Sequence, residues 1–94
     1  MITVFIEYKL EPEKRTKGML LLADMAARME GMGAKQYRSW EGVDQPGLFV
    51  EAFDVDTLEQ YEQIKAVRLT DRDFCNCVAG AGKLNVWAFR AAEL

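Results

Sequence analysis

The sequence predicts one α+β domain over residues 1–94, with a four-stranded antiparallel sheet and two helices on one face. Three observations carry this prediction. Four segments alternate apolar and polar residues with the period of two that is typical of strands. Two further segments repeat apolar residues at helical spacing. Glycine or proline residues separate most of these six segments.

The first strand is predicted in ITVFIEYK, where apolar residues occupy every second position from Ile2 to Tyr8. The period then changes, and a helix is expected from Pro12 to Glu30, with proline in the first turn and glycines at its end. The residues spaced to form its apolar face are Leu22, Met25, Ala26 and Met29.

Two further alternating segments, AKQYRSWEG and GLFVEAFDV, predict a β-hairpin. Pro46 and Gly47 between them suit a type II turn, because proline fixes φ and glycine tolerates a positive φ. Asp56 or Thr57 is expected to cap a second helix with Leu58, Tyr61 and Ile64 facing the core. The segment KLNVWAFRA predicts the last strand.

The resulting order β-α-β-β-α-β is that of the ferredoxin-like fold. One set of alternating residues is expected to pack beneath the helices: Ile2, Val4, Ile6, Leu48, Val50, Ala52, Leu84, Val86 and Ala88. The opposite face then holds Phe5, Glu7, Phe49, Glu51, Phe53, Asn85, Trp87 and Phe89, joined by Arg38 and Trp40. A face so rich in aromatic residues predicts a homodimer that packs sheet against sheet. A bulge that reverses one strand's faces would weaken this prediction.

The chain resembles the dimeric α+β barrel superfamily, and most closely the small domains of the antibiotic-biosynthesis-monooxygenase type. The resemblance rests on the strand order, the aromatic sheet face, the segment WEGVDQPGLFVEAFDVDTLEQY and the final VWAF, and it covers essentially the whole chain. It implies a homodimer with a ligand cavity between sheet and helices, and activities such as cofactor-independent oxygenation or isomerisation.

Composition excludes several classes of function. The net charge of -3 and the scattered lysines and arginines argue against nucleic-acid binding. The sequence has no apolar run near the ~20 residues of a membrane helix. Its first residues do not have the pattern of a secretory leader, so a cytoplasmic protein is expected. Histidine is absent, which removes the usual haem ligand and Ser-His or Cys-His nucleophiles. No cofactor is expected.

Cys75 and Cys77 lie one residue apart in DFCNCVAGAGK. This spacing makes a poor disulfide, and a zinc ion would need ligands from two chains. A redox or nucleophilic role would need a neighbour such as Arg72 or Lys83 to lower a thiol pKa. We expect packing instead, with one cysteine lining a pocket and the following glycines leading into the last strand.

Four polar residues are predicted to lie among aromatic side chains, and they form the candidate catalytic set: Arg38, Glu7, Glu51 and Asn85. Arg38 would bind an anionic or enolate oxygen, and Glu7 or Glu51 would act as a general base with a pKa raised by burial. Trp40, Phe53 and Trp87 would stack on a flat substrate. The alternative is structural: Arg38 would bridge a carboxylate and fix the dimer register.

The resemblance adds Tyr37 as a further candidate for substrate binding. Its monooxygenases use a set of Trp, Asn, Tyr and Arg, and Trp87, Asn85, Tyr37 and Arg38 are residues of the same types. Two functions therefore stay open. One is a cofactor-independent monooxygenase or isomerase that acts on a small aromatic or enolisable compound. The other is a non-catalytic module that binds a ligand or dimerises.

Overall fold

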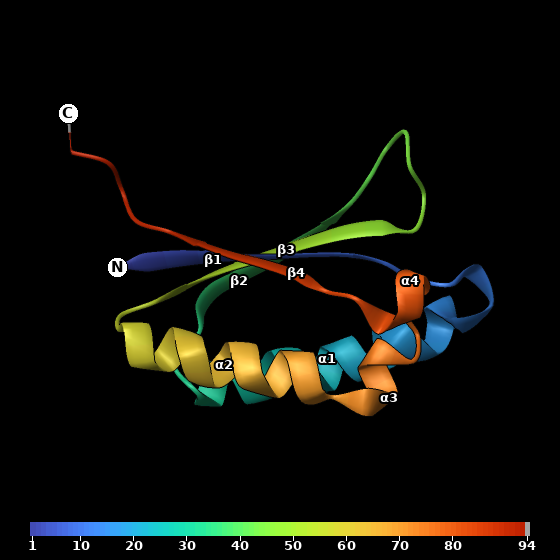
Figure 1. Cartoon of the computed structure of the whole chain (residues 1–94), viewed down its shortest axis with the longest axis horizontal. Helices are drawn as coiled ribbons and strands as arrows, with labels where there is room; N and C mark the ends of the chain where they lie inside the picture. Colours follow the sequence, from blue (N-terminus) through green and yellow to red (C-terminus); the bar gives the residue numbers. More distant parts are fainter. Residues whose placement is uncertain (94) are drawn as a thin grey trace.

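The computed structural model describes residues 1–93 and confirms the predicted fold. The strands are β1 (Ile2–Lys9), β2 (Lys35–Glu41), β3 (Leu48–Val55) and β4 (Asn85–Phe89). The helical elements are η1 (Pro12–Lys14), α1 (Arg15–Gly31), α2 (Leu58–Thr70), α3 (Arg72–Cys75) and α4 (Ala79–Gly82). All strand pairs are antiparallel, in the order β2-β3-β1-β4 (Figure 1). No helix in residues 1–93 is long and apolar enough to cross a membrane.

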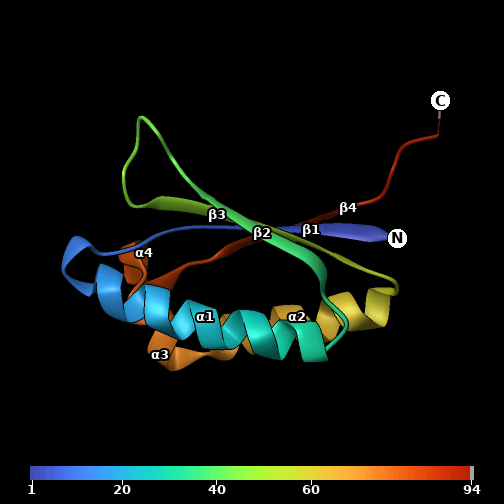
Figure 2. The same cartoon turned by 180° about the vertical axis from the view of Figure 1, so that it is seen from behind.

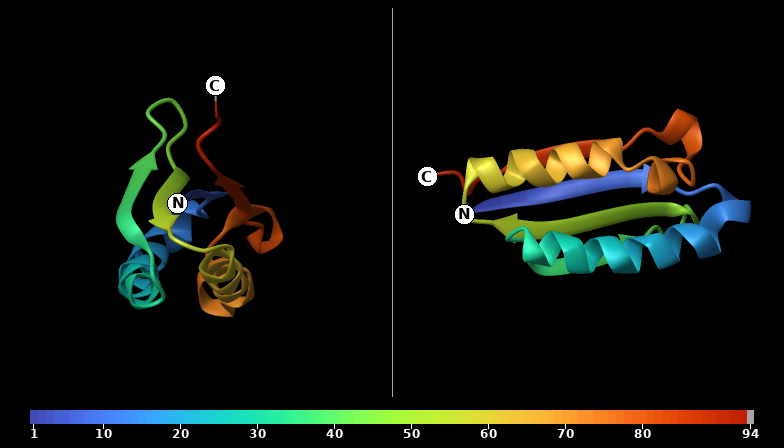
Figure 3. Two further views of the ribbon diagram at one scale, coloured as in Figure 1. Left: turned by 90° about the vertical axis from the view of Figure 1, so that its left-hand side faces the viewer. Right: turned by 90° about the horizontal axis from the view of Figure 1, so that it is seen from below.

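The two long helices lie side by side on one face of the sheet, as the end-on view in Figure 3 shows. The core fills the layer between them and the sheet, with Leu22, Met25 and Met29 contributed by α1. Thr57 caps α2 through a capping box: its hydroxyl accepts from Gln60 N–H, while the Gln60 side chain accepts from Thr57 N–H. The hairpin turn holds Gly47 at a φ of 90°, as the Pro-Gly pair predicts.

The faces of β3 are reversed relative to the prediction. Ile6 of β1, which is buried under the helices, lies opposite Glu51. Phe49, Glu51 and Phe53 therefore face the helices, and Leu48, Val50 and Ala52 lie on the opposite side of the sheet. Both faces of this strand are largely apolar and each carries one carboxylate, Glu51 or Asp54, so the local pattern did not determine which face packs under the helices. The prediction was correct for β1 and β4, since Val86 and Ala88 pair with buried residues of β1.

A β-bulge in β2 separates Lys35 from Arg38. Lys35 pairs with Asp54 and Arg38 with Ala52, so an advance of three residues in β2 matches an advance of two in β3. Gln36 lies at the bulge and has a φ of 54°. The bulge keeps Arg38 on the face opposite the helices and turns Tyr37 toward the core.

The buried face of α2 extends further than predicted at one end and less far at the other. Tyr61 and Ile64 are buried as expected, but Leu58, the first residue of the helix, is exposed. Arg68 continues the same face and is fully buried. Its spacing of four from Ile64 and seven from Tyr61 places it toward the sheet.

Gly33, in the turn between α1 and β2, is required by both its backbone and its surroundings. Its φ is 104°, and an added Cβ would lie 2.5 Å from Nε2 of Gln60, whose side chain caps α2. We therefore expect Gly33→Ala to lower the free energy of unfolding by about 1–3 kcal/mol. Urea denaturation measures this, with Gly31→Ala as a control because nothing lies within 4 Å of its added Cβ.

Candidate functional site

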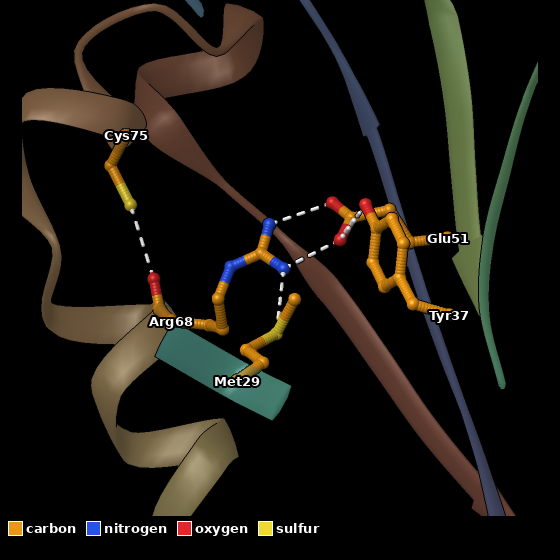
Figure 4. A network of polar contacts seen from close by, with 5 residues as sticks. All are labelled: Met29, Tyr37, Glu51, Arg68 and Cys75. Carbon is orange, nitrogen blue, oxygen red and sulfur yellow. Dashed lines mark hydrogen bonds and ion pairs between the residues drawn. The ribbon is translucent and has the colours of Figure 1, made fainter. Parts of the chain in front are cut away.

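A buried ion pair lies between the sheet and the helices (Figure 4). Glu51 comes from β3 and Arg68 from α2, and both side chains are 0% exposed. Arg68 donates from Nη1 to Glu51 Oε1 at 2.6 Å and from Nη2 to Oε2 at 2.7 Å, and Nη1 also lies 3.4 Å from Sδ of Met29. Such bidentate pairs are the strongest form of the interaction, and the hydrogen bonds partly offset the cost of burying both charges.

Two tyrosines belong to the same cluster. The Tyr37 hydroxyl donates to Glu51 Oε1 at 2.8 Å. Burial, followed by the negative charge of Glu51, raises the pKa of both Tyr37 and Tyr8, so both phenols stay protonated at neutral pH. For Arg68, burial acts to lower the pKa, but the hydrogen bonds and charge of Glu51 outweigh it and raise the pKa. Arg68 thus stays charged. Tyr8, Tyr37, Glu51 and Arg68 are called the polar cluster below.

An aromatic wall supports the polar cluster from α3. The edge of the Tyr8 ring meets Phe74, with ring centroids 5.1 Å apart and planes at 90°. The guanidinium carbon of Arg68 lies 5.1 Å from the centroid of the same Phe74 ring. Tyr8 also stacks on Phe49. The cluster is therefore rigidly packed, and α3 contributes to its geometry.

A surface hollow of about 740 Å³ lies where α1 ends and β2 begins. Its lining consists of Ala26, Ala27, Glu30, Gly33, Ala34, Lys35, Gln36 and Tyr37. Tyr37 is the one lining residue that also belongs to the polar cluster. The β2 bulge therefore connects the hollow with the buried ion pair through a single side chain.

The structure divides the predicted site residues between the two faces of the sheet. Tyr37, Glu51 and Phe53 lie on the helix side. The remaining five lie on the face opposite the helices, which we call the outer face: Glu7, Arg38, Trp40, Asn85 and Trp87. These two groups cannot act on one ligand within a subunit, because the sheet separates them.

On the outer face, Arg38 makes local polar contacts. It donates to the carbonyl of Gln36 at 2.6 Å and lies 3.9 Å from a carboxylate oxygen of Asp54. Asp54 also accepts a hydrogen bond from the Thr3 hydroxyl at 2.8 Å. This arrangement resembles the structural alternative, in which Arg38 bridges a carboxylate, more than it resembles a substrate clamp.

Sequence reasoning missed Arg68 and Tyr8 as members of a polar site. The helical spacing of Arg68 was the available signal, because a charge on the buried face of a helix requires a partner. Tyr8 was recognised as facing the core, but its position gave no sign of a neighbouring carboxylate. Both assignments require knowing that Glu51 lies on the side of β3 that faces the helices.

The cysteine segment is packed, in agreement with the expectation. Phe74, Cys77 and Val78 are buried, and Cys75 is half-buried with a thiol pKa raised by burial and by Asp71. A raised pKa disfavours the reactive thiolate. Residues 1–93 contain no group of three or more His, Cys, Asp or Glu side chains placed to hold a metal ion.

A surface ion pair at the other end of β2 has a predictable pH dependence. Hydrogen bonds from the Arg15 side chain and the Gly47 N–H lower the pKa of Glu41 from 4.5 to about 2. Because the folded pKa lies below the unfolded one, the stabilisation is present above pH 4.5 and is lost as pH falls toward 2. We expect Glu41→Gln to reduce the slope of stability with pH in that window. Urea midpoints measured across it provide the test, with the exposed Glu13→Gln as a control.

Comparison with known proteins identifies the fold. No protein-family model and no curated protein sequence matches the chain, whereas 29 solved chains match its structure. A structure of an antibiotic biosynthesis monooxygenase matches with a TM-score of 0.77 and 13% identity, covering 99% of this chain and 100% of that one. SnoaB, a cofactor-independent oxygenase from Streptomyces nogalater, matches with a TM-score of 0.75 and 10% identity over 99% and 94%. Rv0793 from Mycobacterium tuberculosis matches with a TM-score of 0.70 and 16% identity over 99% and 96%.

Proposed function

We propose that this protein is a homodimeric, cofactor-independent oxygenase acting on a small enolisable aromatic compound. The observation that carries the proposal is the polar cluster, which is buried against the helices and linked through Tyr37 to a surface hollow. The fold shared with SnoaB, a cofactor-independent oxygenase, supports it by analogy. A buried group of titratable residues beside a hollow is also a frequent feature of active sites.

The residues of the cluster suit stabilisation of a developing oxyanion. Arg68 is held as a cation, and the two tyrosines are held as neutral phenols. Preorganised donors of this kind lower the energy of an enolate most effectively where water is excluded. Glu51 is not a free base, because each of its carboxylate oxygens already accepts a hydrogen bond from Arg68. Its role in the proposal is to orient Arg68 and Tyr37.

This division of roles restricts the substrate. With Glu51 engaged and no histidine in the chain, the site offers no strong base. The substrate must therefore ionise readily by itself, as phenols and enolised diketones do. Its enolate would transfer electrons directly to O₂. The reactive CH₂ would become C=O, with one oxygen atom entering the product and the other leaving as water.

The outer face is the proposed dimer interface. Its exposed aromatic side chains are Trp40, Trp87 and Phe89, which are 52%, 45% and 55% exposed. Phe5 of the same face packs edge-on against Phe89. Figures 1 and 2 show the β2–β3 loop and the segment after β4 rising on this side of the sheet, away from the helices. A second copy placed sheet to sheet would cover the apolar surface. Glu7, Arg38 and Asn85 would then lie in the interface.

Oxygen uptake tests the proposed chemistry, with benzoylacetone as the enolisable aromatic probe. We expect uptake above the protein-free rate, with a product that has gained one oxygen atom and lost two hydrogens. Treatment with a chelator should leave the rate unchanged. In the proposal the Tyr37 hydroxyl turns from Glu51 to the enolate oxygen, so Tyr37→Phe should lower the rate by about 100-fold, the usual effect of removing one oxyanion donor. Tyr61→Phe is the control, because Tyr61 lies outside the polar cluster. Uptake equal to the protein-free rate would contradict the proposal.

A non-catalytic module is the second candidate function. The observation that favours it is the complete mutual pairing of the Glu51 and Arg68 side-chain ends, an arrangement that also serves folding alone. In that case the protein would take up no oxygen above the protein-free rate, whether or not it binds the probe. The dimer would form in both cases, so oxygen uptake separates the two functions.

A further inference from the structure

The outer face carries two carboxylates, and Glu7 is the one without a partner. Asp54 accepts a hydrogen bond from Thr3 and lies near Arg38, whereas no ion pair within residues 1–93 includes Glu7. Glu7 lies on a central strand of the sheet, between the neighbouring strands β3 and β4. A second copy placed on this face would bury its charge, which is costly unless a cation accompanies it.

Arg38 can supply that cation to a neighbouring molecule. Its Nη1 donates to the carbonyl of Gln36 at 2.6 Å, and its distance of 3.9 Å from Asp54 is too long for a hydrogen bond. A guanidinium group has several N–H donors in a fixed plane, so this bond leaves others available. The Arg38 side chain is 39% exposed on the outer face, where these donors are accessible.

The strand pairing arranges the outer face in rows that run from β2 to β4. One row is Trp40, Val50, Glu7 and Asn85, and the next is Arg38, Ala52, Phe5 and Trp87. Glu7 and Arg38 are therefore two strands and one row apart, a separation of roughly 12 Å between Cα atoms at ordinary strand spacing. No ion pair joins the two side chains within the subunit. The midpoint between them lies over β3.

Twofold symmetry can bring these two residues together across an interface. When two copies face each other about a twofold axis, every contact is reciprocal, so a contact of Glu7 with the partner subunit's Arg38 forms twice. An axis over β3, between Val50 and Ala52, produces this arrangement. The small side chains at that point allow close approach of the two sheets. This axis also lies near the middle of the face, so the exposed aromatic side chains of each copy lie opposite the other sheet.

The outer face has two other cations, and neither fits Glu7 as well. Lys35 is already paired with Asp56 at 2.7 Å. Lys9 lies at the end of β1, on the same strand as Glu7. An axis midway between Lys9 and Glu7 would lie at that end of the sheet, and Phe89 at the opposite end would then extend beyond the partner.

We propose that two copies of this chain recognise each other through reciprocal ion pairs between Glu7 of one subunit and Arg38 of the other. The inference rests on the homodimer of the proposed function. It goes beyond that dimer because it assigns the contacts that determine how one sheet lies on the other. The aromatic side chains contribute the apolar area of the interface, and the ion pairs select its register and its partner.

Charge reversal tests the reciprocity. In a homodimer of Glu7→Arg, two cations meet at each contact, and in a homodimer of Arg38→Glu, two carboxylates meet. We therefore expect each variant alone to dimerise about 100-fold more weakly than the original protein, as measured by sedimentation over a dilution series. A mixture of the two variants has opposite charges at both contacts. It should form heterodimers almost exclusively, and native mass spectrometry separates the three dimers by mass.

Glu62→Arg is the matched control, because Glu62 is exposed on α2, on the other side of the sheet. It should dimerise as the original protein does, and it should not restore dimers when mixed with Arg38→Glu. Three results would each overturn the inference. They are single variants that dimerise normally, a statistical mixture of the three dimers, and restoration of Glu7→Arg by Lys9→Glu in place of Arg38→Glu.

Neutral variants give a second measurement if a charge-reversed variant does not fold. Glu7→Gln and Arg38→Gln should each weaken dimerisation about tenfold, because each leaves one buried charge without its partner. The two substitutions together should weaken it no further than either alone, since the second removes the charge that the first left unpaired. Effects that add in the double variant would contradict a direct contact.

The outcomes separate this inference from the proposed function. An original protein that sediments as a single chain would contradict both the proposed dimer and this inference. A dimer whose variants mix statistically would overturn the inference and leave the proposed dimer standing. Oxygen uptake from benzoylacetone tests the oxygenase chemistry independently of either result.

Discussion

Arg68→Met is expected to lower the free energy of unfolding by about 3–5 kcal/mol, because it leaves the Glu51 carboxylate buried without its cation. For a domain of this size the loss is a large part of the total stability, which is typically ~5–15 kcal/mol. Urea denaturation followed by circular dichroism measures it. Arg72→Met is the control, since Arg72 is exposed at the start of α3.

The double variant Glu51→Leu with Arg68→Met makes the same prediction testable if the single variant does not fold. Replacing both partners removes the buried charges together, so we expect the double variant to be more stable than Arg68→Met alone. A double variant no more stable than the single one would show that shape, and not charge, determines the stability. A loss below about 1 kcal/mol for Arg68→Met would contradict the buried pair itself.

Trp87→Glu is expected to convert the proposed dimer into a monomer. The substitution puts a charge among the aromatic residues of the outer face, where sheet-to-sheet packing would bury it without a partner. Sedimentation should give a mass of twice 10.7 kDa for the original protein and 10.7 kDa for the variant. Leu20→Glu is the matched control, because Leu20 is an exposed apolar residue on α1, which lies on the other side of the sheet.

Either of two outcomes would exclude the outer face as the interface. In one, the original protein sediments as a single chain. In the other, Leu20→Glu dissociates the dimer and Trp87→Glu does not. Arg38→Ala adds information about register: loss of the dimer without loss of oxygen uptake from benzoylacetone would assign Arg38 to the interface and not to the ligand.

Much of the fold was predictable from the sequence because each element has a local signal. Pro12 begins the first helical segment, Thr57 and Gln60 form a capping box, and Gly47 has the positive φ that its turn requires. Strand β1 has clear alternation, so its faces followed directly. The aromatic outer face was partly predictable for the same reason, through β4.

The candidate site was less predictable because it depends on pairing across the fold. Glu51 is hydrophilic, and local pattern alone places a carboxylate on the exposed face of a strand. Its burial becomes favourable only when Arg68, seventeen residues later, completes the ion pair. The bulge at Gln36, which turns Tyr37 toward Glu51, also has no distinctive residue at the position of positive φ. Tertiary contacts, and not local propensity, therefore determine the site.

A crystal structure grown with benzoylacetone in the absence of oxygen would show both where the ligand lies and how the subunits assemble. We expect a flat molecule in the hollow, with an oxygen atom within hydrogen-bond distance of the Tyr37 hydroxyl, and two copies packed through their outer faces. A ligand held between Arg38 and Trp87 on the outer face, with the Tyr37–Glu51 hydrogen bond intact and the hollow empty, would contradict this expectation.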